Sequence, residues 1–333
     1  MKKESSQNSD IKLIDFSNFS LKRVYLSGYW LTVWYQSPYP EEYCSRKDLY
    51  ICEKCLKYMK YPKSLLAHKE QCDAKYPKGL IVYEDSTCAV YQIDGKVEKL
   101  YCQNLCLLSK LFLDQKTLYY DVSLFLFYIL YTKSTIAGCD PTFVGYFSKE
   151  KKSVENYNLA CVLTFPQFRG QHHGYEISKL KRCVGSPEKP LSSQGFAIYK
   201  SYWRSAILLY LLQKTKQPET SENNTSLPLA LKILPHSSEE SSVKVQTDRS
   251  DSNLISEPLE LISVFSIEEL ALETGISIED ILSTLDDLYL LSHWKDEHTI
   301  YLTHALILKA IKTLGITFKK RLDPLGIIPE NLY

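Results

Sequence analysis

Four side chains at fixed spacing constrain the fold of this chain more than any other feature. Two residues separate Cys52 from Cys55. Twelve residues further on, His68 is separated from Cys72 by three residues. A thiolate pair on a tight turn, followed by a His/Cys pair one helical turn apart, is the spacing of a zinc finger. We predict a structural zinc site, with His68 on a helix over 64–71. The alternative is two buried free thiols and a surface histidine.

The cysteine count bears on the compartment. The chain has ten cysteines, and its first residues, MKKESSQNSD, lack the apolar core of a secretory signal. We therefore expect a reducing compartment, with the cysteines as metal ligands, buried thiols or nucleophiles. The longest apolar block, Val122 to Tyr131, is too short for a bilayer, so no membrane span is expected. A net charge of +1 does not indicate a nucleic-acid binder.

Composition and periodicity divide the chain into five parts. We expect a disordered N-terminus (1–20), an N-terminal region (21–80) with the zinc finger (52–72), a mixed α+β core (81–212), a disordered polar insertion (213–258) and a C-terminal module (259–333). Within the core, Asp94-Gly95 predicts a hairpin turn between strands over 80–93 and 97–101.

The C-terminal module has the signals of two short helices. Ser266 with Glu269 forms a capping box, Gly275 predicts a turn, and Ser277 predicts the start of a second helix. Helix, turn, helix and a small wing resemble a helix-turn-helix unit. The second helix carries four acidic residues, Glu279, Asp280, Asp286 and Asp287. A DNA-reading helix needs basic or amide side chains, so we favour a structural or protein-binding role.

The stretch from Asn158 to Ser192 carries the candidate chemistry. An apolar run over 159–165 predicts a strand that contains Cys161, and a Gly-Ser-Pro-Glu-Lys-Pro loop carries Glu188. A strand cysteine and a loop carboxylate make a plausible reactive pair. Taken alone, Cys161 is more simply a buried thiol and Glu188 a surface residue.

These motifs together resemble the catalytic domain of MYST-type histone acetyltransferases, from about Tyr29 to Pro324. The strings that carry the resemblance are WYQSPYPEEY, LYICEKCLKYMKYPKSLLAHKEQC, LFLDQKTLYYDVSLFLFY, VGYFSKEK, NLACVLTFP, GSPEKPLS and RLDP. The resemblance implies a GNAT-like α+β core, an N-terminal zinc finger and a C-terminal helix-turn-helix-like segment. It also implies a nuclear enzyme that transfers the acetyl group of acetyl-CoA to a lysine of a histone H3 or H4 tail. Such an enzyme regulates chromatin and transcription.

The resemblance also assigns roles to single residues. Glu188 matches the general base, Cys161 the active-site cysteine, and Lys116 the lysine that the family acetylates on itself. The zinc ligands are those predicted from spacing. The residues that match acetyl-CoA contacts are Ala160, Cys161, Val162, Leu163, Thr164, Arg169, Gly170, Ser192 and Ser201. Chromatin targeting is expected to depend on other subunits of a multiprotein complex, and sequence-specific DNA binding is not expected.

One segment departs from the family pattern. The family has a Gln-Arg-x-Gly-x-Gly-Lys loop before a helix, where backbone N–H groups receive the CoA pyrophosphate. The segment from Pro166 to Tyr175 is shorter here and keeps Arg169, Gly170 and Gly174. Three explanations stay open: an error in the gene model, a weakened or inactive acetyltransferase that serves as a scaffold, and a shorter loop that still binds CoA. A DNA-binding zinc-finger regulator is a further, weaker alternative.

Overall fold

The computed structural model describes residues 20–74, 76, 78–117, 120–133, 141–169, 184–214, 229–233, 263–290, 298–302, 304–316 and 328. The chain divides into two compact units. Unit 1 comprises residues 1–155, 159–177 and 322–333, and unit 2 comprises residues 156–158 and 178–321. The predicted α+β class, with a zinc-finger region before the main sheet, is confirmed.

Unit 1 holds two sheets. The first has the strand order β2-β1-β3-β4, with β1 (Arg23–Leu26), β2 (Tyr29–Thr32), β3 (Asp48–Ile51) and β4 (Tyr58–Met59). The second is antiparallel, in the order β10-β8-β7-β6-β5, with β5 (Leu80–Glu84), β6 (Cys88–Asp94), β7 (Phe125–Thr132), β8 (Thr142–Glu150) and β10 (Cys161–Thr164). The helices of this unit are α1 (Glu41–Cys44), α2 (Pro62–Gln71), α3 (Lys99–Lys110) and the short 3-10 helix η1 (Pro166–Phe168).

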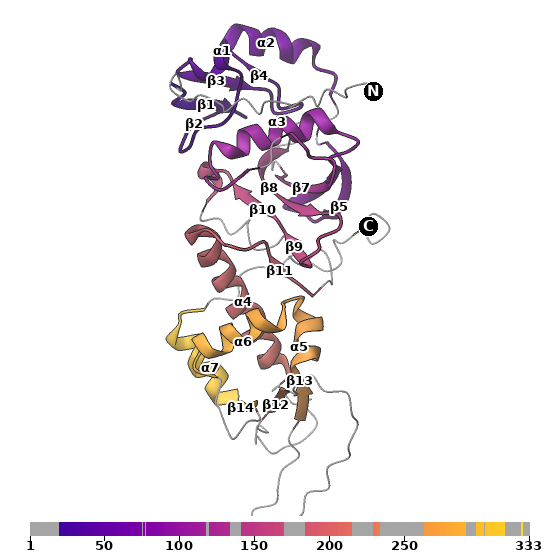
Figure 1. Cartoon of the computed structure of the whole chain (residues 1–333), viewed down its shortest axis with the longest axis vertical. Helices are drawn as coiled ribbons and strands as arrows, with labels where there is room; N and C mark the ends of the chain where they lie inside the picture. The colour runs from indigo at the N-terminus through magenta and orange to yellow at the C-terminus, as the bar shows by residue number, and fades with distance from the viewer. Residues whose placement is uncertain are drawn as a thin grey trace, which may run out of the picture. The chain divides into compact units, whose positions relative to one another are not determined.

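One hydrophobic core joins both sheets of unit 1 to α3. It includes Val24 and Leu49 from the first sheet, Leu105 from α3, and Ile129 and Tyr146 from the second sheet, all fully buried. Figure 1 shows α3 between the two sheets, which is where these side chains meet. The second sheet is therefore fixed on the face that packs on α3.

The predicted strand over 97–101 is wrong, because the chain turns into α3 there. The backbone N–H of Val97 donates to the carbonyl of Asp94 at 3.1 Å and begins a helical turn. Gly95 lies so close to Val122 that an added Cβ would come within 1.9 Å of the Val122 carbonyl oxygen. The Asp94-Gly95 pair thus directs the chain from β6 into α3 and not into a second strand.

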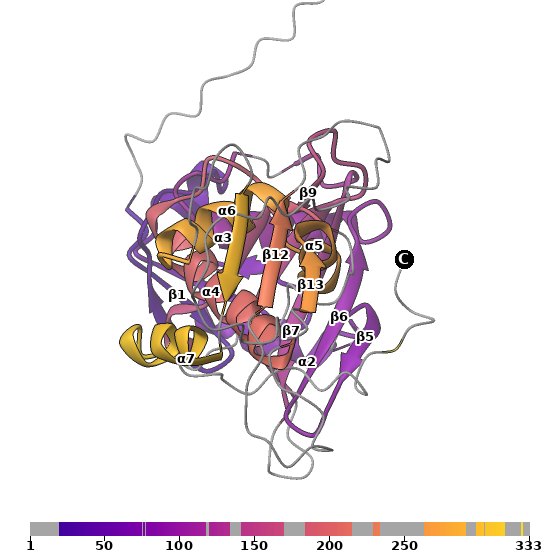
Figure 2. The same ribbon diagram turned by 90° about the horizontal axis from the view of Figure 1, so that it is seen from below.

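Unit 2 combines helices with two small sheets. Its elements are β9 (Tyr157–Leu159), β11 (Ser186–Pro187), α4 (Ser193–Lys214), β12 (Leu229–Ile233), β13 (Ser263–Ser266), α5 (Ile267–Thr274), α6 (Ile278–Asp287), β14 (His298–Leu302) and α7 (His304–Thr313). Strand β11 pairs with β9. Figure 2 shows β12 between β13, to which it is parallel, and β14, to which it is antiparallel. The disordered polar insertion predicted over 213–258 is wrong for the end of α4 and for β12, which pairs with β13 and β14.

Both helix starts predicted in the C-terminal module are confirmed. The side chain of Ser266 accepts a hydrogen bond from the Glu269 N–H at 3.1 Å, and that of Ser277 accepts one from the Asp280 N–H at 3.3 Å. Gly275 ends α5 with φ of 70°, a left-handed conformation that suits glycine. The helix–glycine turn–helix arrangement therefore has the predicted form. Among the described residues, no helix combines the length and the apolar character needed to cross a bilayer.

Candidate functional sites

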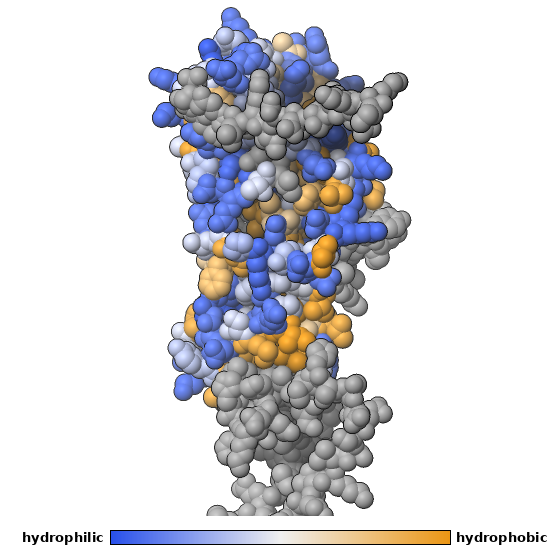
Figure 3. Space-filling view, viewed as in Figure 1, coloured by the Kyte–Doolittle hydropathy of each residue, from blue (hydrophilic) through white to orange (hydrophobic). Residues whose placement is uncertain are grey.

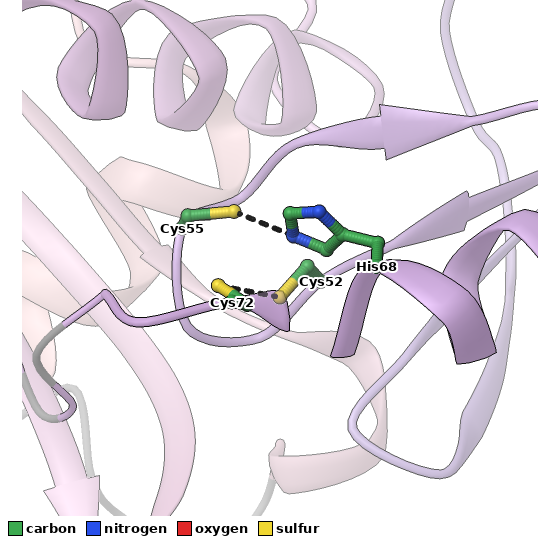
Figure 4. Close-up of side chains that lie close together, drawn as sticks. All are labelled: Cys52, Cys55, His68 and Cys72. Carbon is green, nitrogen blue, oxygen red and sulfur yellow. Dashed lines mark hydrogen bonds between the residues drawn. The ribbon is translucent and has the colours of Figure 1, made fainter. Parts of the chain in front are cut away.

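The four predicted zinc ligands converge in unit 1. Cys52 and Cys55 lie between β3 and β4, His68 lies on α2, and Cys72 follows its last turn. Their ligand atoms all lie within 4.8 Å of one another (Figure 4). The Cys52 and Cys72 sulfurs are 3.9 Å apart, and Cys55 Sγ lies 3.2 Å from His68 Nε2. Tetrahedral zinc with Zn–S bonds of about 2.3 Å separates two sulfurs by about 3.8 Å. The site therefore fits structural zinc.

Proton sharing within this cluster favours a thiolate ligand. The side-chain hydrogen bond from Cys55 is the largest cause of a lowered pKa at Cys52. The same interaction is the largest cause of a raised pKa at Cys55. Zinc binds the thiolate form, so a site that already stabilises one thiolate is prepared for the metal.

The finger region has only a small apolar core. Its buried members are Cys52, Met59 and Leu65, and Leu65 is the one buried residue of α2. Figure 3 shows a largely hydrophilic surface at the upper end of the view, where α2 lies. An ion pair of 2.7 Å between Lys69 of α2 and Glu53 links the helix to the β3–β4 turn, and zinc held by His68 and Cys72 would add a second link where few apolar side chains pack.

Cys161 begins β10, the edge strand of the second sheet in the described part of the chain. Its N–H donates to Ser148 Oγ at 3.3 Å, and the Phe165 N–H donates to the Val144 carbonyl at 3.0 Å. N–H groups alternate in direction along a strand. The amide of Val162 therefore points away from β8, toward the open edge of the sheet.

Lys116 is a buried lysine beside this strand. Its side chain is 7% exposed, and its Nζ lies 3.8 Å from Cys161 Sγ. Burial opposes the charge on Lys116, but Tyr146, Cys161 and Cys106 act more strongly in the other direction and raise the pKa of the ammonium. Burial also raises the pKa of Cys106. The predicted self-acetylated lysine and the predicted active-site cysteine are thus in contact.

Glu188 lies in unit 2, on the exposed loop that follows β11. Two backbone hydrogen bonds fix the start of this loop. Gly185 donates to the carbonyl of Gly275 at 3.3 Å and accepts from the N–H of Ser277 at 3.1 Å. The turn between α5 and α6 therefore holds the chain just before Glu188.

Comparison with known proteins shows which family has this combination of sites. The sequence matches the MYST family zinc finger domain over residues 11–72 and the MOZ/SAS family over residues 76–233. The chain belongs to the MYST (MOZ/SAS) family.

Several curated MYST relatives match most of this chain. Histone acetyltransferase of the MYST family 1 from Arabidopsis thaliana is 39% identical over 303 residues, or 89% of this chain and 57% of the relative. Histone acetyltransferase ESA1 from Debaryomyces hansenii is 37% identical over 315 residues, or 92% of this chain and 59% of the relative. Histone acetyltransferase MOF from Drosophila melanogaster is 35% identical over 314 residues, or 92% of this chain and 31% of the relative. The chain spans little more than half the length of the first two relatives.

The remaining residues that the MYST resemblance assigns to acetyl-CoA have varied surroundings. Arg169 donates from Nε to the Thr164 carbonyl at 3.2 Å, and its guanidinium lies 4.2 Å from the centre of the Trp34 ring. Burial lowers the pKa of Arg169. Ser192 accepts from the Gly195 N–H at 3.1 Å and so caps α4. Ser201 is exposed on α4. Gly170, and a further helix expected over 175–181, lie outside the described residues.

Two residues of the MYST site region escaped sequence reasoning. Ser148 is 2% exposed and receives the Cys161 N–H, while Trp34 lies under Arg169. Neither has a local sequence signal, because each meets its partner only through the fold. The antiparallel alignment of β8 with β10 brings Ser148 opposite Cys161.

Proposed function

We propose that this MYST chain is a nuclear lysine acetyltransferase that moves the acetyl group of acetyl-CoA to a lysine ε-amine of a histone tail. The backbone edge of β10 beside Cys161, which pairs with no second strand among the residues that the structure describes, is the observation that carries the proposal. The pantetheine arm of CoA contains amide groups that can pair with such an edge. The names of the relatives, all histone acetyltransferases, support the same reaction.

Glu188 is the proposed general base. A free lysine has a pKa of about 10.4, so its neutral amine lies roughly 4–5 kcal/mol uphill at pH 7. A carboxylate that accepts the ammonium proton during attack reduces that barrier. Exposure of the Glu188 loop is consistent with access for a protein substrate.

The strand with Cys161 is proposed to hold the thioester. An N–H directed at the carbonyl oxygen stabilises the negative charge that develops there, and the outward amide of Val162 has a suitable direction. The other proposed acetyl-CoA contacts are Ala160, Leu163, Thr164, Arg169, Gly170, Ser192 and Ser201. We favour direct attack by the lysine amine, which forms the amide bond and expels the CoA thiolate. Cys161 then shapes the site and carries no acetyl group.

Lys116 is the proposed site of self-acetylation. Its raised pKa keeps the side chain protonated at neutral pH, and an ammonium has no lone pair for attack. Acetylation therefore needs a proton acceptor, and Cys161 Sγ at 3.8 Å would serve as one in its thiolate form, becoming the thiol as the amine is released. Acetylation would also remove a buried positive charge.

Histone H3 or H4 tails in nucleosomes and the subunits of an acetyltransferase complex are the proposed partners. A DNA-reading role is disfavoured, because the acidic residues of α6 bind basic side chains of this chain. Asp287 lies 2.6 Å from Lys200 Nζ and 3.7 Å from Arg204 Nη2. The alternative, a chain of the same fold that serves only as a scaffold, is suggested by the short segment over 166–175. The experiment below distinguishes it from an active enzyme.

The test uses the full chain with purified histones. We expect acetyl-CoA binding by calorimetry at micromolar affinity or better, together with acetylation of H3 or H4. Glu188→Gln should lower kcat by about 10²–10⁴-fold and leave acetyl-CoA affinity unchanged. Glu155→Gln, at an exposed turn of unit 1, is the matched control and should behave as the native chain.

Two results would overturn parts of this proposal. If the chain did not bind acetyl-CoA, the enzyme proposal would fail and a scaffolding role for the same fold would replace it. Native binding together with full activity of Glu188→Gln would remove Glu188 as the base while keeping the acetyltransferase.

A further inference from the structure

The residue that follows Glu188 is held by α6. Lys189 Nζ lies 3.5 Å from Glu279 Oε2 and 3.7 Å from Asp280 Oδ1. The two acidic partners differ in their surroundings. The side chain of Glu279 is 85% exposed, whereas that of Asp280 is 7% exposed. The side chain of Lys189 is 45% exposed, so only its pair with the buried Asp280 is partly shielded from solvent, and Asp280 is the partner better able to fix Lys189.

Asp280 is itself immobilised by the N-terminus of α6. Its Oδ2 accepts a hydrogen bond from Ser277 Oγ at 2.8 Å, and its backbone N–H donates to Ser277 Oγ at 3.3 Å. The positive end of the helix also favours a carboxylate at this position. A buried carboxylate is costly without a charged partner, and Lys189 is within reach of its second oxygen.

The other side of the Glu188 loop is fixed by backbone contacts. Gly185 forms a parallel bridge with Ile276, within the turn that begins α6. An added Cβ on Gly185 would come within 2.7 Å of the Asn156 carbonyl oxygen, so the backbone is closely enclosed. The segment around Glu188 is therefore attached to the start of α6 on both sides, by backbone before it and by an ion pair after it.

We propose that Asp280 is a positioning residue for Glu188, acting through Lys189. The inference rests on the proposed role of Glu188 as the base. It gives the helix-turn-helix-like module a function for which an acidic second helix is suited. The same acidic helix is not suited to reading DNA. A loop residue must be held to well under 1 Å for efficient proton transfer, since a misplacement of about 1 Å can lower a rate by roughly 100-fold.

The experiment compares charge-removing variants of the full chain. Asp280→Asn should lower kcat roughly tenfold at saturating acetyl-CoA and histone H4 tail, with the KM for acetyl-CoA within about twofold. Glu279→Gln, which removes the exposed partner of the same lysine, should stay within about twofold of native kcat. Lys189→Arg should retain activity because it keeps the charge.

A double variant tests whether the two residues act as one unit. Lys189→Met combined with Asp280→Asn should be no slower than the slower single variant, because each single change already breaks the pair. Fully multiplicative losses would overturn the proposed route through Lys189.

Two measurements separate positioning from simple loss of stability. Ser266→Ala removes the cap of α5 and leaves Ser277, Asp280 and Lys189 in place, so it should lower the melting temperature and leave kcat near native. Hydrogen exchange of the peptide over 185–190 should accelerate in Asp280→Asn and stay native in Glu279→Gln, whether or not the chain is active.

The outcomes distinguish this inference from the function on which it rests. Native kcat and native exchange in Asp280→Asn, with Glu188→Gln inactive, would overturn the positioning role and leave the base in place. Full activity of Glu188→Gln would overturn both.

Discussion

The Lys116 ammonium lies 3.8 Å from the Cys161 sulfur, between the end of α3 and the edge strand of the main sheet. Lys116 is almost fully buried, and Tyr146 and Cys106 contribute to its surroundings. Solvent therefore does little to stabilise its charge, which depends on these neighbours. The contact makes the chemical state of one residue sensitive to that of the other.

Lys116→Met tests this coupling, because methionine has similar length and no charge. We expect Cys161 to react roughly three- to tenfold more slowly with iodoacetamide, because methionine lacks the N–H donor that lies 3.8 Å from the Cys161 sulfur. The melting temperature should fall, because the raised pKa of Lys116 means that its neighbours stabilise the ammonium in the folded state, and this contribution is lost. Mass spectrometry of the Cys161 peptide gives the rate. Lys152→Met, at an exposed turn, is the control, and an equal slowing in that variant would contradict the explanation.

Removal of zinc should unfold the finger region. Structural zinc contributes roughly 10–16 kcal/mol in finger peptides, and the apolar core around α2 is small. His68→Ala should therefore lose bound metal and lower the melting temperature, as should a chelator added to the native chain. Metal content by atomic absorption measures the loss. Cys88→Ala removes a buried thiol that is not a ligand and should retain one zinc per chain. Full zinc in His68→Ala would contradict the ligand assignment.

The zinc site could be predicted from sequence because its geometry is mostly local. The thiolate pair lies on one turn, His68 lies on α2, and Cys72 directly follows the last residue of that helix. The capped starts of α5 and α6 could be predicted for the same reason, since a cap joins residues three positions apart.

Long-range contacts could not be predicted in this way. Lys116 and Cys161 are 45 positions apart and meet only through the order of strands in the main sheet. The error over 97–101 has a similar origin. Asp94-Gly95 suits a hairpin locally, but close packing of Gly95 on Val122 decides the path of the chain.

Asp85 should make stability depend on pH in the acid range. Its carboxylate accepts hydrogen bonds from the Thr87 and Cys88 N–H groups at 2.6 and 2.8 Å, and from Tyr83 Oη at 2.8 Å. Burial opposes the charge, but these hydrogen bonds outweigh it and hold the pKa of Asp85 well below its usual value. A depressed carboxylate pKa contributes stability above the unfolded pKa of about 3.9, and the contribution is lost as pH falls through the folded pKa.

Asp85→Asn should thus lower the melting temperature by about 2–6 °C at pH 7. The difference from the native chain should shrink as the pH falls below about 4, because the unfolded chain then binds a proton at Asp85 that the folded chain does not bind until its lower pKa is reached. Thermal unfolding followed by circular dichroism from pH 7 to pH 2 measures both effects. Glu84→Gln is the neighbouring control, whose exposed pair with Lys133 should contribute little. A difference independent of pH would show that shape, and not charge, explains the Asp85 effect.

Gly145→Ala should displace the strand that carries Cys161. A Cβ at position 145 would lie 2.2 Å from the Leu163 carbonyl oxygen and 3.0 Å from Thr164 Cα, both backbone atoms of β10. The strand must therefore move away from β8, and we expect weaker acetyl-CoA binding together with a loss of about 1–3 kcal/mol in the free energy of unfolding. Calorimetry and denaturant unfolding measure the two quantities. Val144→Ala is the matched control, because it empties space in the core without pushing on β10 and should lower stability while native affinity is kept. If Gly145→Ala were destabilised to the same degree and still bound acetyl-CoA as the native chain does, the edge of β10 would not be the binding surface.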